Sequence, residues 1–337
     1  MKLLVVGNPG REHVGSHLID AAQELGLDAE LADTRRAAGR FAWQRRLCWH
    51  LLGRRPAALG AFNRELIETW RRFRPDVILA TGIAPLQAAT LRGLKKAGVT
   101  LVNYLTDDPW NRANSARHFW AALPLFDAVF SPRRAATPDL ERLGCPRVEY
   151  LPFAYNPCAH FVERPPSPEL AERYRCDLLI IGGADRDRIP LAEGAVAAGL
   201  DVHLYGGYWD RVPALRSSWK GFIYGQEMRW AVSAATANLV MGRKANRDGH
   251  AMRSYEVPAM GGAMVVEDTE DHRALFGRSG DAVLYYRTTE EMVDAVDRLR
   301  SDPGQADAMA GAAKDCVTRR PNAYAHRLGA MLESAIP

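Results

Sequence analysis

Short apolar runs alternate with longer amphipathic stretches along most of this chain. The runs are rich in valine, leucine and isoleucine, and many end at glycine, aspartate or proline. Such runs, separated by segments long enough for a helix, predict parallel strands joined by helical crossovers. The predicted strands cover 1–7, 77–80, 100–105, 128–131, 147–151, 177–181, 202–207, 237–241, 263–267 and 282–286.

The segments that follow these runs show helical periodicity. They predict an α/β protein whose sheets are covered by helices, in which ligands bind beyond the carboxyl ends of the strands. Predicted helices cover 16–25, 85–97, 135–143, 190–198, 226–234, 289–300, 303–317 and 323–336, and another carries Glu256 and ends at Gly261.

A proline-rich segment near the midpoint predicts a domain boundary. Leu151–Pro157 and Pro165–Pro168 locally lack periodicity, which is typical of a linker. A chain of 337 residues also suits two domains of ~150 residues each. We therefore expect domains at 1–152 and 153–320, with a last helical segment at 321–337.

Composition narrows the class of protein. The net charge of +4 is mild, so charge alone does not favour nucleic acid. The five cysteines are scattered without a C-x-x-C pair, which argues against a disulfide framework or a zinc site and favours a reducing cytoplasm. No apolar run approaches the ~20 residues of a membrane span. No histidine and aspartate cluster has ligand spacing, so we expect no metal.

The segment 35–64 is strongly basic. It contains eight arginines and no acid, and its Trp43, Leu47, Trp49 and Leu51 have near-helical spacing. This pattern favours an amphipathic helix. Such a helix would lie on an anionic membrane surface, line a site that accepts an acidic or aromatic substrate, or be a partly buried helix with a solvated basic face.

Two strand ends in the first half carry candidate functional residues. A glycine-bearing turn follows the first strand, where the backbone at Gly10 can approach a ligand and His13 lies near the helix start. The dinucleotide spacing G-x-G-x-x-G is absent, so a nicotinamide or flavin site is not supported. Asp107 and Asp108 follow the end of another strand and precede Pro109. They either belong to a functional site at this strand end or cap the next helix.

The second half carries basic residues at the equivalent strand ends. Gly183, Arg186 and Arg188 would cradle a diphosphate, or the two arginines would pair with neighbouring aspartates on a solvated turn. Lys244 adds positive charge before the next loop, and Tyr224 or Phe222 offers a flat wall for a base, although core packing explains either ring equally well.

The loop Asp248–His250 leads into a helix that contains Arg253 and Glu256. A loop at a helix start presents unpaired N–H groups that suit a phosphate, and Gly249 lets the backbone approach closely. Carboxylates beside a phosphate site are better placed to accept hydrogen bonds from sugar or ribose hydroxyls. The residues that we expect to bind this ligand are Gly10, Gly183, Arg186, Arg188, Tyr224, Lys244, Asp248, Gly249, His250, Arg253 and Glu256.

The spacing Asp248-x7-Glu256 resembles the E-x7-E element of retaining glycosyltransferases with the GT-B fold, and the run 252–256 is similar to their CgeB-like branch. The first acid is Asp where the family usually has Glu. Tyr104–Pro109 resembles the strand-end Asp-Asp-Pro of that branch, and Leu151–Pro157 resembles its interdomain segment. The resemblance extends over nearly the whole chain.

This resemblance implies two doubly wound Rossmann-like domains that face a cleft, with the last helix returning to the first domain. It implies transfer of a sugar from a nucleoside diphosphate sugar, without a cofactor, to an acceptor held by the first domain. Glu256 would accept from ribose hydroxyls and Asp248 from the sugar, while Arg188, Lys244 and Arg253 would stabilise the diphosphate. His13, Asp107 or Asp108 would lie near the anomeric carbon.

Two other functions stay open at this point. A sugar-nucleotide epimerase on the same fold would convert the donor without an acceptor, and a non-catalytic GT-B-like protein would only bind the nucleotide. The motif implies retention of configuration, although a base among the same residues would permit inversion. The sugar, the base, the acceptor, the oligomeric state and the role of 35–64 are not fixed by the sequence.

Overall fold

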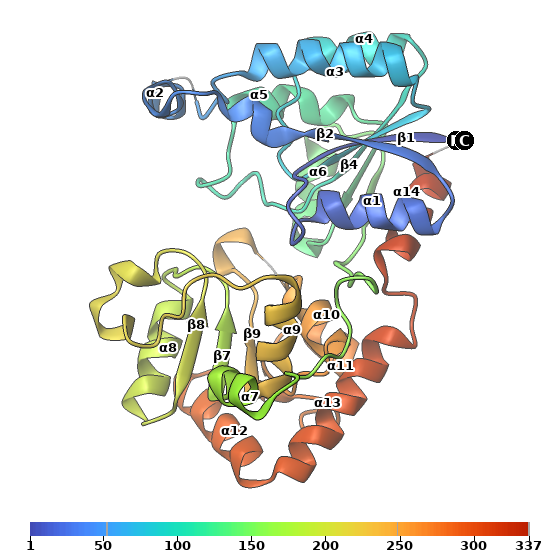
Figure 1. Ribbon diagram of the computed structural model, residues 1–337. Helices are drawn as coiled ribbons and strands as arrows, with labels where there is room; N and C mark the ends of the chain where they lie inside the picture. The colour runs from blue at the N-terminus through green and yellow to red at the C-terminus, as the bar shows by residue number, and fades with distance from the viewer. Residues whose placement is uncertain (52, 248, 336–337) are drawn as a thin grey trace. The chain divides into compact units, whose positions relative to one another are not determined.

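A computed structural model of the protein describes residues 1–51, 53–247 and 249–335. The chain forms two compact units, each with its own parallel sheet (Figure 1). Unit 1 comprises Met1–Pro152, Ala245–Arg247 and Tyr324–Pro337, and unit 2 comprises Phe153–Lys244 and Asp248–Ala323. The predicted α/β fold class with two parallel sheets is confirmed.

Unit 1 contains a six-stranded sheet in the order β2-β1-β3-β4-β5-β6, in which every pair of strands is parallel. The central strands are almost entirely apolar, as expected for a sheet that is covered on both faces. Its strands are β1 (Lys2–Gly7), β2 (Asp28–Asp33), β3 (Val77–Thr81), β4 (Thr100–Tyr104), β5 (Ala128–Ser131) and β6 (Val148–Tyr150).

Helices cover both faces of this sheet (Figure 1). Phe62 and Leu66 of α3 and Leu91 of α4 pack in one core cluster with Ile78 of β3. On the other side α14, the last helix, contacts α1, β4 and β5. The helical segments of unit 1 are α1 (Val14–Glu24), η1 (Thr34–Ala38), α2 (Ala42–Leu51), α3 (Leu59–Phe73), α4 (Ala88–Lys96), α5 (Arg117–Ala122), η2 (Leu123–Leu125), η3 (Arg134–Ala136), α6 (Thr137–Arg142) and α14 (Tyr324–Ala335).

The basic segment 35–64 contains an amphipathic helix, as predicted, but only α2, with Trp43, Leu47 and Leu51, has this pattern. It contributes to three helical pieces, η1, α2 and α3. Gly39 and Gly53 interrupt the helix with φ values of +84° and +59°, a backbone conformation that glycine adopts without steric cost. Pro56 follows and cannot donate a backbone hydrogen bond. The strand β2 was not predicted, because its acidic ends and partly exposed residues leave no apolar run.

Unit 2 contains a five-stranded parallel sheet in the order β11-β10-β9-β7-β8. Leu191 of α8 and Met292 and Val296 of α12 pack in one core cluster with Leu178 and Ile180 of β7. The strands are β7 (Cys176–Ile181), β8 (Val202–Tyr205), β9 (Ala235–Val240), β10 (Met264–Glu267) and β11 (Leu284–Tyr286).

The predicted helices of unit 2 are confirmed, and α7 and α11 are additional to them. Leu204 N–H donates to the Ser218 carbonyl oxygen and Lys220 N–H donates to the Leu204 carbonyl oxygen, so the segment 218–220 covers the outer edge of β8. The helical segments that follow Phe153 and precede α14 are α7 (Pro168–Tyr174), α8 (Arg188–Ala197), η4 (Trp209–Arg211), η5 (Pro213–Leu215), α9 (Gly225–Ala234), η6 (Lys244–Asn246), α10 (Arg253–Ala259), α11 (Glu270–Phe276), α12 (Thr289–Ser301) and α13 (Pro303–Thr318).

Strand order locates the expected ligand position in each unit. In unit 1, β1 lies between β2 and β3; in unit 2, β7 lies between β8 and β9. At these central strands the order in which successive strands are added changes from one side of the sheet to the other. In doubly wound folds, ligands bind at the carboxyl ends of the strands at such a switch point. The loops after β1, β3, β7 and β9 are therefore the candidate site segments. None of the described helices is long and apolar enough to cross a bilayer.

Candidate functional site

Three arginines gather at the carboxyl ends of β7 and β9 in unit 2. Arg188 begins α8, Arg243 follows β9 and Arg253 begins α10. Arg188 donates through Nη1 to Asp185 Oδ2 at 2.5 Å, and Arg243 Nε lies 3.8 Å from the same carboxylate. Burial lowers the pKa of Arg188; the Asp185 charge opposes this, and the nearby charges of Arg243 and Arg253 lower the pKa further. The cluster is a positive site suited to an anion.

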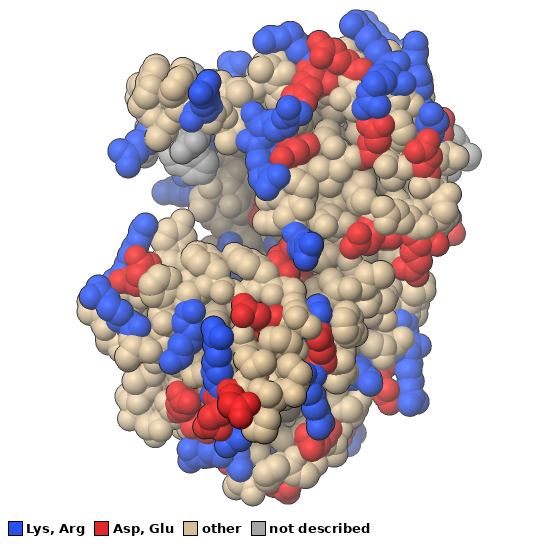
Figure 2. Space-filling model, viewed as in Figure 1, with Lys and Arg blue, Asp and Glu red and all other residues tan. Residues whose placement is uncertain are grey.

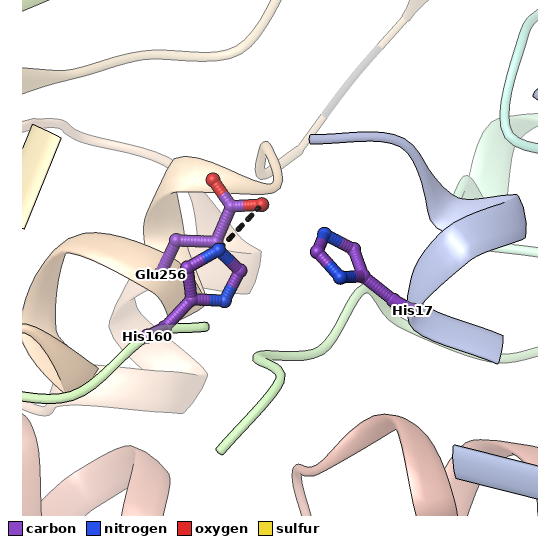
Figure 3. Close-up of side chains that lie close together, drawn as sticks. All are labelled: His17, His160 and Glu256. Carbon is purple, nitrogen blue, oxygen red and sulfur yellow. Dashed lines mark ion pairs between the residues drawn. The ribbon is translucent and has the colours of Figure 1, made fainter. Parts of the chain in front are cut away.

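Glu256 is fully buried on α10, next to this cluster. Its Oε2 accepts a hydrogen bond from Arg253. His160 Nε2 lies 3.9 Å from Oε1, and Figure 3 marks this contact with a dashed line. Oε1 accepts no hydrogen bond from any residue that the structure describes. A buried carboxylate oxygen without a donor is costly, so this atom is available to a ligand hydroxyl.

The protonation of His160 follows from its partners. The ring is buried, which lowers its pKa to about 3, and the charges of Arg253 and Arg229 lower it too. His160 is therefore neutral at pH 7. Its Nδ1 accepts from the Asn156 N–H at 3.0 Å, so the single ring proton lies on Nε2, on the side of Glu256. Among the described residues, Glu256 is thus bonded to the charged Arg253 through Oε2, while the neutral ring of His160 stands near Oε1 without a hydrogen bond.

A buried network holds the loop before α10. His250 accepts from the Phe153 N–H through Nε2 at 3.2 Å, and its Nδ1 lies 3.2 Å from Asp271 Oδ2. A Cβ at Gly249 would clash with the Asp271 carboxylate. Gly249 and His250 therefore have structural roles in the loop: the glycine leaves room for Asp271, and the histidine fixes the loop. Asp248, the first acid of the predicted pair, lies outside the described residues.

A second part of this network fixes the start of α10. Ser254 Oγ lies 2.8 Å from His272 Nε2, and His272 Nδ1 lies 2.8 Å from the Glu267 carbonyl oxygen. Since the carbonyl can only accept, Nδ1 carries the proton and Nε2 accepts from the serine hydroxyl. Burial lowers the pKa of His272 to about 4. These contacts position the helix that carries Arg253 and Glu256.

The buried histidines predict loss of stability in mild acid. His160 and His272 have pKa values of about 3 and 4 in the folded protein, but about 6.5 when unfolded. Between these values the unfolded chain binds more protons, so the free energy of unfolding falls as pH drops from 6.5 towards 4. Each histidine contributes about 1.4 kcal/mol per pH unit. Urea unfolding at pH 7, 6 and 5 measures this.

The matched variants for this prediction are His272→Gln and His326→Gln. The first removes a buried titrating ring and should make stability less dependent on pH, whereas His326 is exposed and its replacement should leave the slope unchanged. An equal slope in wild type and His272→Gln would refute the assignment of His272 as a buried neutral histidine.

Two exposed aromatic rings lie beyond β8. Phe222 and Tyr224 stack with ring centroids 6.4 Å apart and an interplanar angle of 12°, and both rings are more than half exposed. Core packing, the ordinary interpretation of these residues, is therefore excluded. Exposed flat rings of this kind suit stacking against a base.

The other residues of unit 2 that the sequence predicts at the donor site are either exposed or in close contact with neighbouring backbone. Arg186 is exposed, and its Nε lies 3.8 Å from Asp187; the Lys244 side chain is exposed as well. Gly183 lies where a Cβ would come 3.3 Å from the Gly207 carbonyl oxygen. Both arginines of the Gly-Gly turn thus have an aspartate partner, as the ordinary interpretation predicted, but only Arg188 is held tightly.

Unit 1 brings three strand ends together. The Asp107 carboxylate lies against Gly82, where a Cβ would come 2.8 Å from Oδ2. Partial burial lowers the pKa of His13; the charge of Arg35 lowers it further, and that of Asp107 opposes this. His13 is the N-cap residue of α1, but its side chain makes no capping hydrogen bond. Gly10 lies beside the His13 ring, because a Cβ at this glycine would come 2.7 Å from His13 Cδ2. These contacts place His13 and Asp107 in one neighbourhood.

Asp108 differs from its neighbour Asp107. It is 1% exposed and accepts from Arg247 Nε at 2.6 Å and Nη2 at 3.1 Å. It also accepts from the Trp110 N–H at 2.9 Å, so it caps the turn that follows. This geometry favours a structural role for Asp108 and leaves Asp107 as the candidate for chemistry.

Sequence reasoning missed three residues that matter to these sites. His160 lies in the proline-rich segment, where a lone histidine carries no signal. Arg243 precedes Lys244 in the sequence, and only the structure places it beside Asp185. Arg247, from a loop far along the chain, pairs with Asp108 and Asp139 within unit 1. Only its neighbourhood in space reveals that role.

Comparison with known proteins agrees with an α/β fold of two units, each built on a parallel sheet. A glycosyl transferase-like family model matches residues 188–333. Sucrose-phosphate synthase from Thermosynechococcus elongatus has a TM-score of 0.67 at 12% identity, covering 99% of this chain and 98% of that one. HepE from Anabaena, in complex with UDP-glucose, has a TM-score of 0.65 at 15% identity, covering 99% and 100%. The chain has the GT-B fold.

The GT-B neighbours also include an epimerase. UDP-GlcNAc 2-epimerase from Neisseria meningitidis, bound to UDP-GlcNAc, has a TM-score of 0.55 at 11% identity and covers 99% of each chain. At these identities the structural likeness shows the fold alone. A search of curated proteins gave no match. The glycosyl transferase-like match contains Arg188, Arg243, Arg253 and Glu256.

Proposed function

We propose that this protein transfers a glycosyl group from a nucleoside diphosphate sugar to an acceptor. The observation that carries the proposal is the cluster of Arg188, Arg243 and Arg253 at the carboxyl ends of β7 and β9, next to buried Glu256. A diphosphate needs cations and a ribose needs hydrogen-bond acceptors. Unit 2 supplies both. The glycosyl transferase-like match over 188–333 supports the same assignment.

Each part of the donor has a proposed partner. The arginines offset the charge that develops on the departing diphosphate, the effect that preorganised cations have on a transition state, so we propose transfer without a metal. Glu256 accepts from the ribose through Oε1, and the exposed Phe222 and Tyr224 hold the base. The spacing Asp248-x7-Glu256 supports retention of configuration and a CgeB-like relationship.

The chemistry at the sugar is proposed for unit 1 residues. His13 has a lowered pKa, so it is neutral at pH 7 and able to accept a proton. Asp107 stands near it and stabilises the protonated ring. We propose that one of these two residues, rather than Asp108, acts at the reacting carbon.

A nucleotide screen tests the donor site. We expect UDP, GDP, TDP, CDP or ADP, or one of their sugars, to raise the melting temperature, because a ligand that binds only the folded state stabilises it by mass action. UDP is the first choice, since solved structures of GT-B neighbours contain UDP or UDP-sugars. Arg188→Ala should remove most of the shift, whereas exposed Arg278→Ala should retain it. If no nucleotide shifts the melting temperature, this donor site is wrong.

Epimerisation is the second candidate, favoured by the epimerase among the structural neighbours. An epimerase converts the sugar of its donor with no acceptor present, which proton NMR of UDP-sugars incubated with the protein would detect. A transferase shows donor turnover that depends on an added acceptor. Nucleotide binding with neither activity would leave the non-catalytic alternative.

A further inference from the structure

The helix α2 of unit 1 presents an apolar stripe to solvent. Trp43, Leu47 and Leu51 follow one another at intervals of four residues, so they share one face of the helix. They are 64%, 49% and 72% exposed, and Phe41 just before the helix is half exposed. Large apolar side chains normally lie in the core or at an interface. In Figure 2 the tan surface over α2 is bordered by blue side chains.

The charge around this stripe is of one sign. Arg40, Arg46 and Arg55 are exposed, and no ion pair involves them among the described residues. Arg35 and Arg36, in contrast, pair with Asp33 and Glu65. No acid occurs between positions 35 and 64. An exposed apolar face bordered by cations that form no ion pair with the described residues is complementary to an anionic amphiphilic surface.

A cavity of about 480 Å³ adjoins the stripe within unit 1. Leu51 belongs to both the stripe and the cavity wall, and Arg55, Arg117 and His118 supply polar lining. Burial lowers the pKa of His118 to about 4, opposed by the Ala84 backbone and aided by the charge of Arg55. The ring is therefore neutral at pH 7, and the two arginines provide the charge. The remaining wall is mainly apolar, with Leu59 and alanines of α4 and α5.

We propose that α2 docks on an anionic lipid surface, with Trp43, Leu47 and Leu51 at the boundary between head groups and acyl chains, and that the Arg55–Arg117 cavity holds a lipid phosphate. The stripe supplies apolar contact, and the arginines supply attraction to the phosphate charge. The proposal is independent of the donor site in unit 2, because no residue of that site takes part.

Vesicle co-sedimentation of the full chain tests this inference. The probes are vesicles of phosphatidylcholine alone and of phosphatidylcholine mixed with phosphatidylglycerol, without any donor. We expect binding to the anionic vesicles only, and weaker binding at higher salt, because salt screens the arginines. Trp43→Ser/Leu47→Ser should weaken binding by about tenfold or more, and so should Arg55→Gln/Arg117→Gln.

The matched controls are Leu25→Ser and Arg71→Gln/Arg92→Gln. The replaced residues are also exposed in unit 1 but lie away from α2 in the sequence. We expect both control variants to bind vesicles as the wild-type protein does. Thermal melting of each variant verifies folding. The proposal is overturned if the wild-type protein does not bind anionic vesicles, or if the Trp43→Ser/Leu47→Ser and Arg55→Gln/Arg117→Gln variants both bind as tightly as the controls. Stabilisation by glycerol phosphate that depends on Arg55 and Arg117, without vesicle binding, would assign the cavity to a soluble anion instead.

Discussion

Glu256→Gln is expected to weaken UDP binding by about 10- to 100-fold while leaving pyrophosphate binding unchanged or tighter. A hydrogen bond to a charged carboxylate contributes about 1.5–3 kcal/mol, and glutamine removes that charge from Oε1, the oxygen that accepts no hydrogen bond from the described residues. Pyrophosphate has no ribose, and it gains from the loss of a negative charge beside Arg253. Titration calorimetry with UDP and with pyrophosphate measures both affinities.

The comparison of two probes separates the possible roles of Glu256. If both affinities fall together, Glu256 acts only by holding the arginines in place. If neither falls, the carboxylate does not contact the nucleotide. Glu193→Gln is the matched control, because Glu193 is an exposed acid of α8 and its replacement should change neither affinity.

Arg253→Ala is expected to lower the free energy of unfolding by about 3–5 kcal/mol, the cost of leaving one member of a buried ion pair alone. Glu256 is 0% exposed, and in the variant its nearest described partner would be the neutral ring of His160, 3.9 Å away. The same change removes one of three cations from the proposed diphosphate site, so UDP binding should fall as well. Urea unfolding measures the first effect.

A double-mutant cycle isolates the pair. Arg253→Ala/Glu256→Gln removes the buried charge that the single variant leaves alone, so it should recover most of the lost stability while UDP binding stays weak. Arg175→Ala is the matched control: Arg175 pairs with Glu172, and both side chains are 68% exposed, so little change is expected. A loss in Arg253→Ala no larger than in Arg175→Ala would show that the pair is not buried in solution.

The roles of individual residues were harder to predict than the elements that carry them. Asp107 and Asp108 are adjacent and chemically identical, yet Asp108 is buried under Arg247 while Asp107 lies against Gly82 beside His13. His250 looks like a ligand residue in a loop but bonds to Phe153 and Asp271. In the segment 35–64, the spacing of tryptophan and leucine indicated a helical face, but not that glycines would divide it or leave the stripe of α2 exposed.

The sequence by itself determined the two parallel sheets, nearly all their strands, the strand ends at which candidate residues stand and the proximity of Arg253 to Glu256. These are consequences of local periodicity and of spacing on one helix turn. Only the tertiary structure decided that Arg188, Arg243 and Arg253 converge, that His160 faces Glu256, and that Asp108 is a structural residue. Those facts depend on contacts between residues far apart in the chain, whose burial and charge partners no local pattern records.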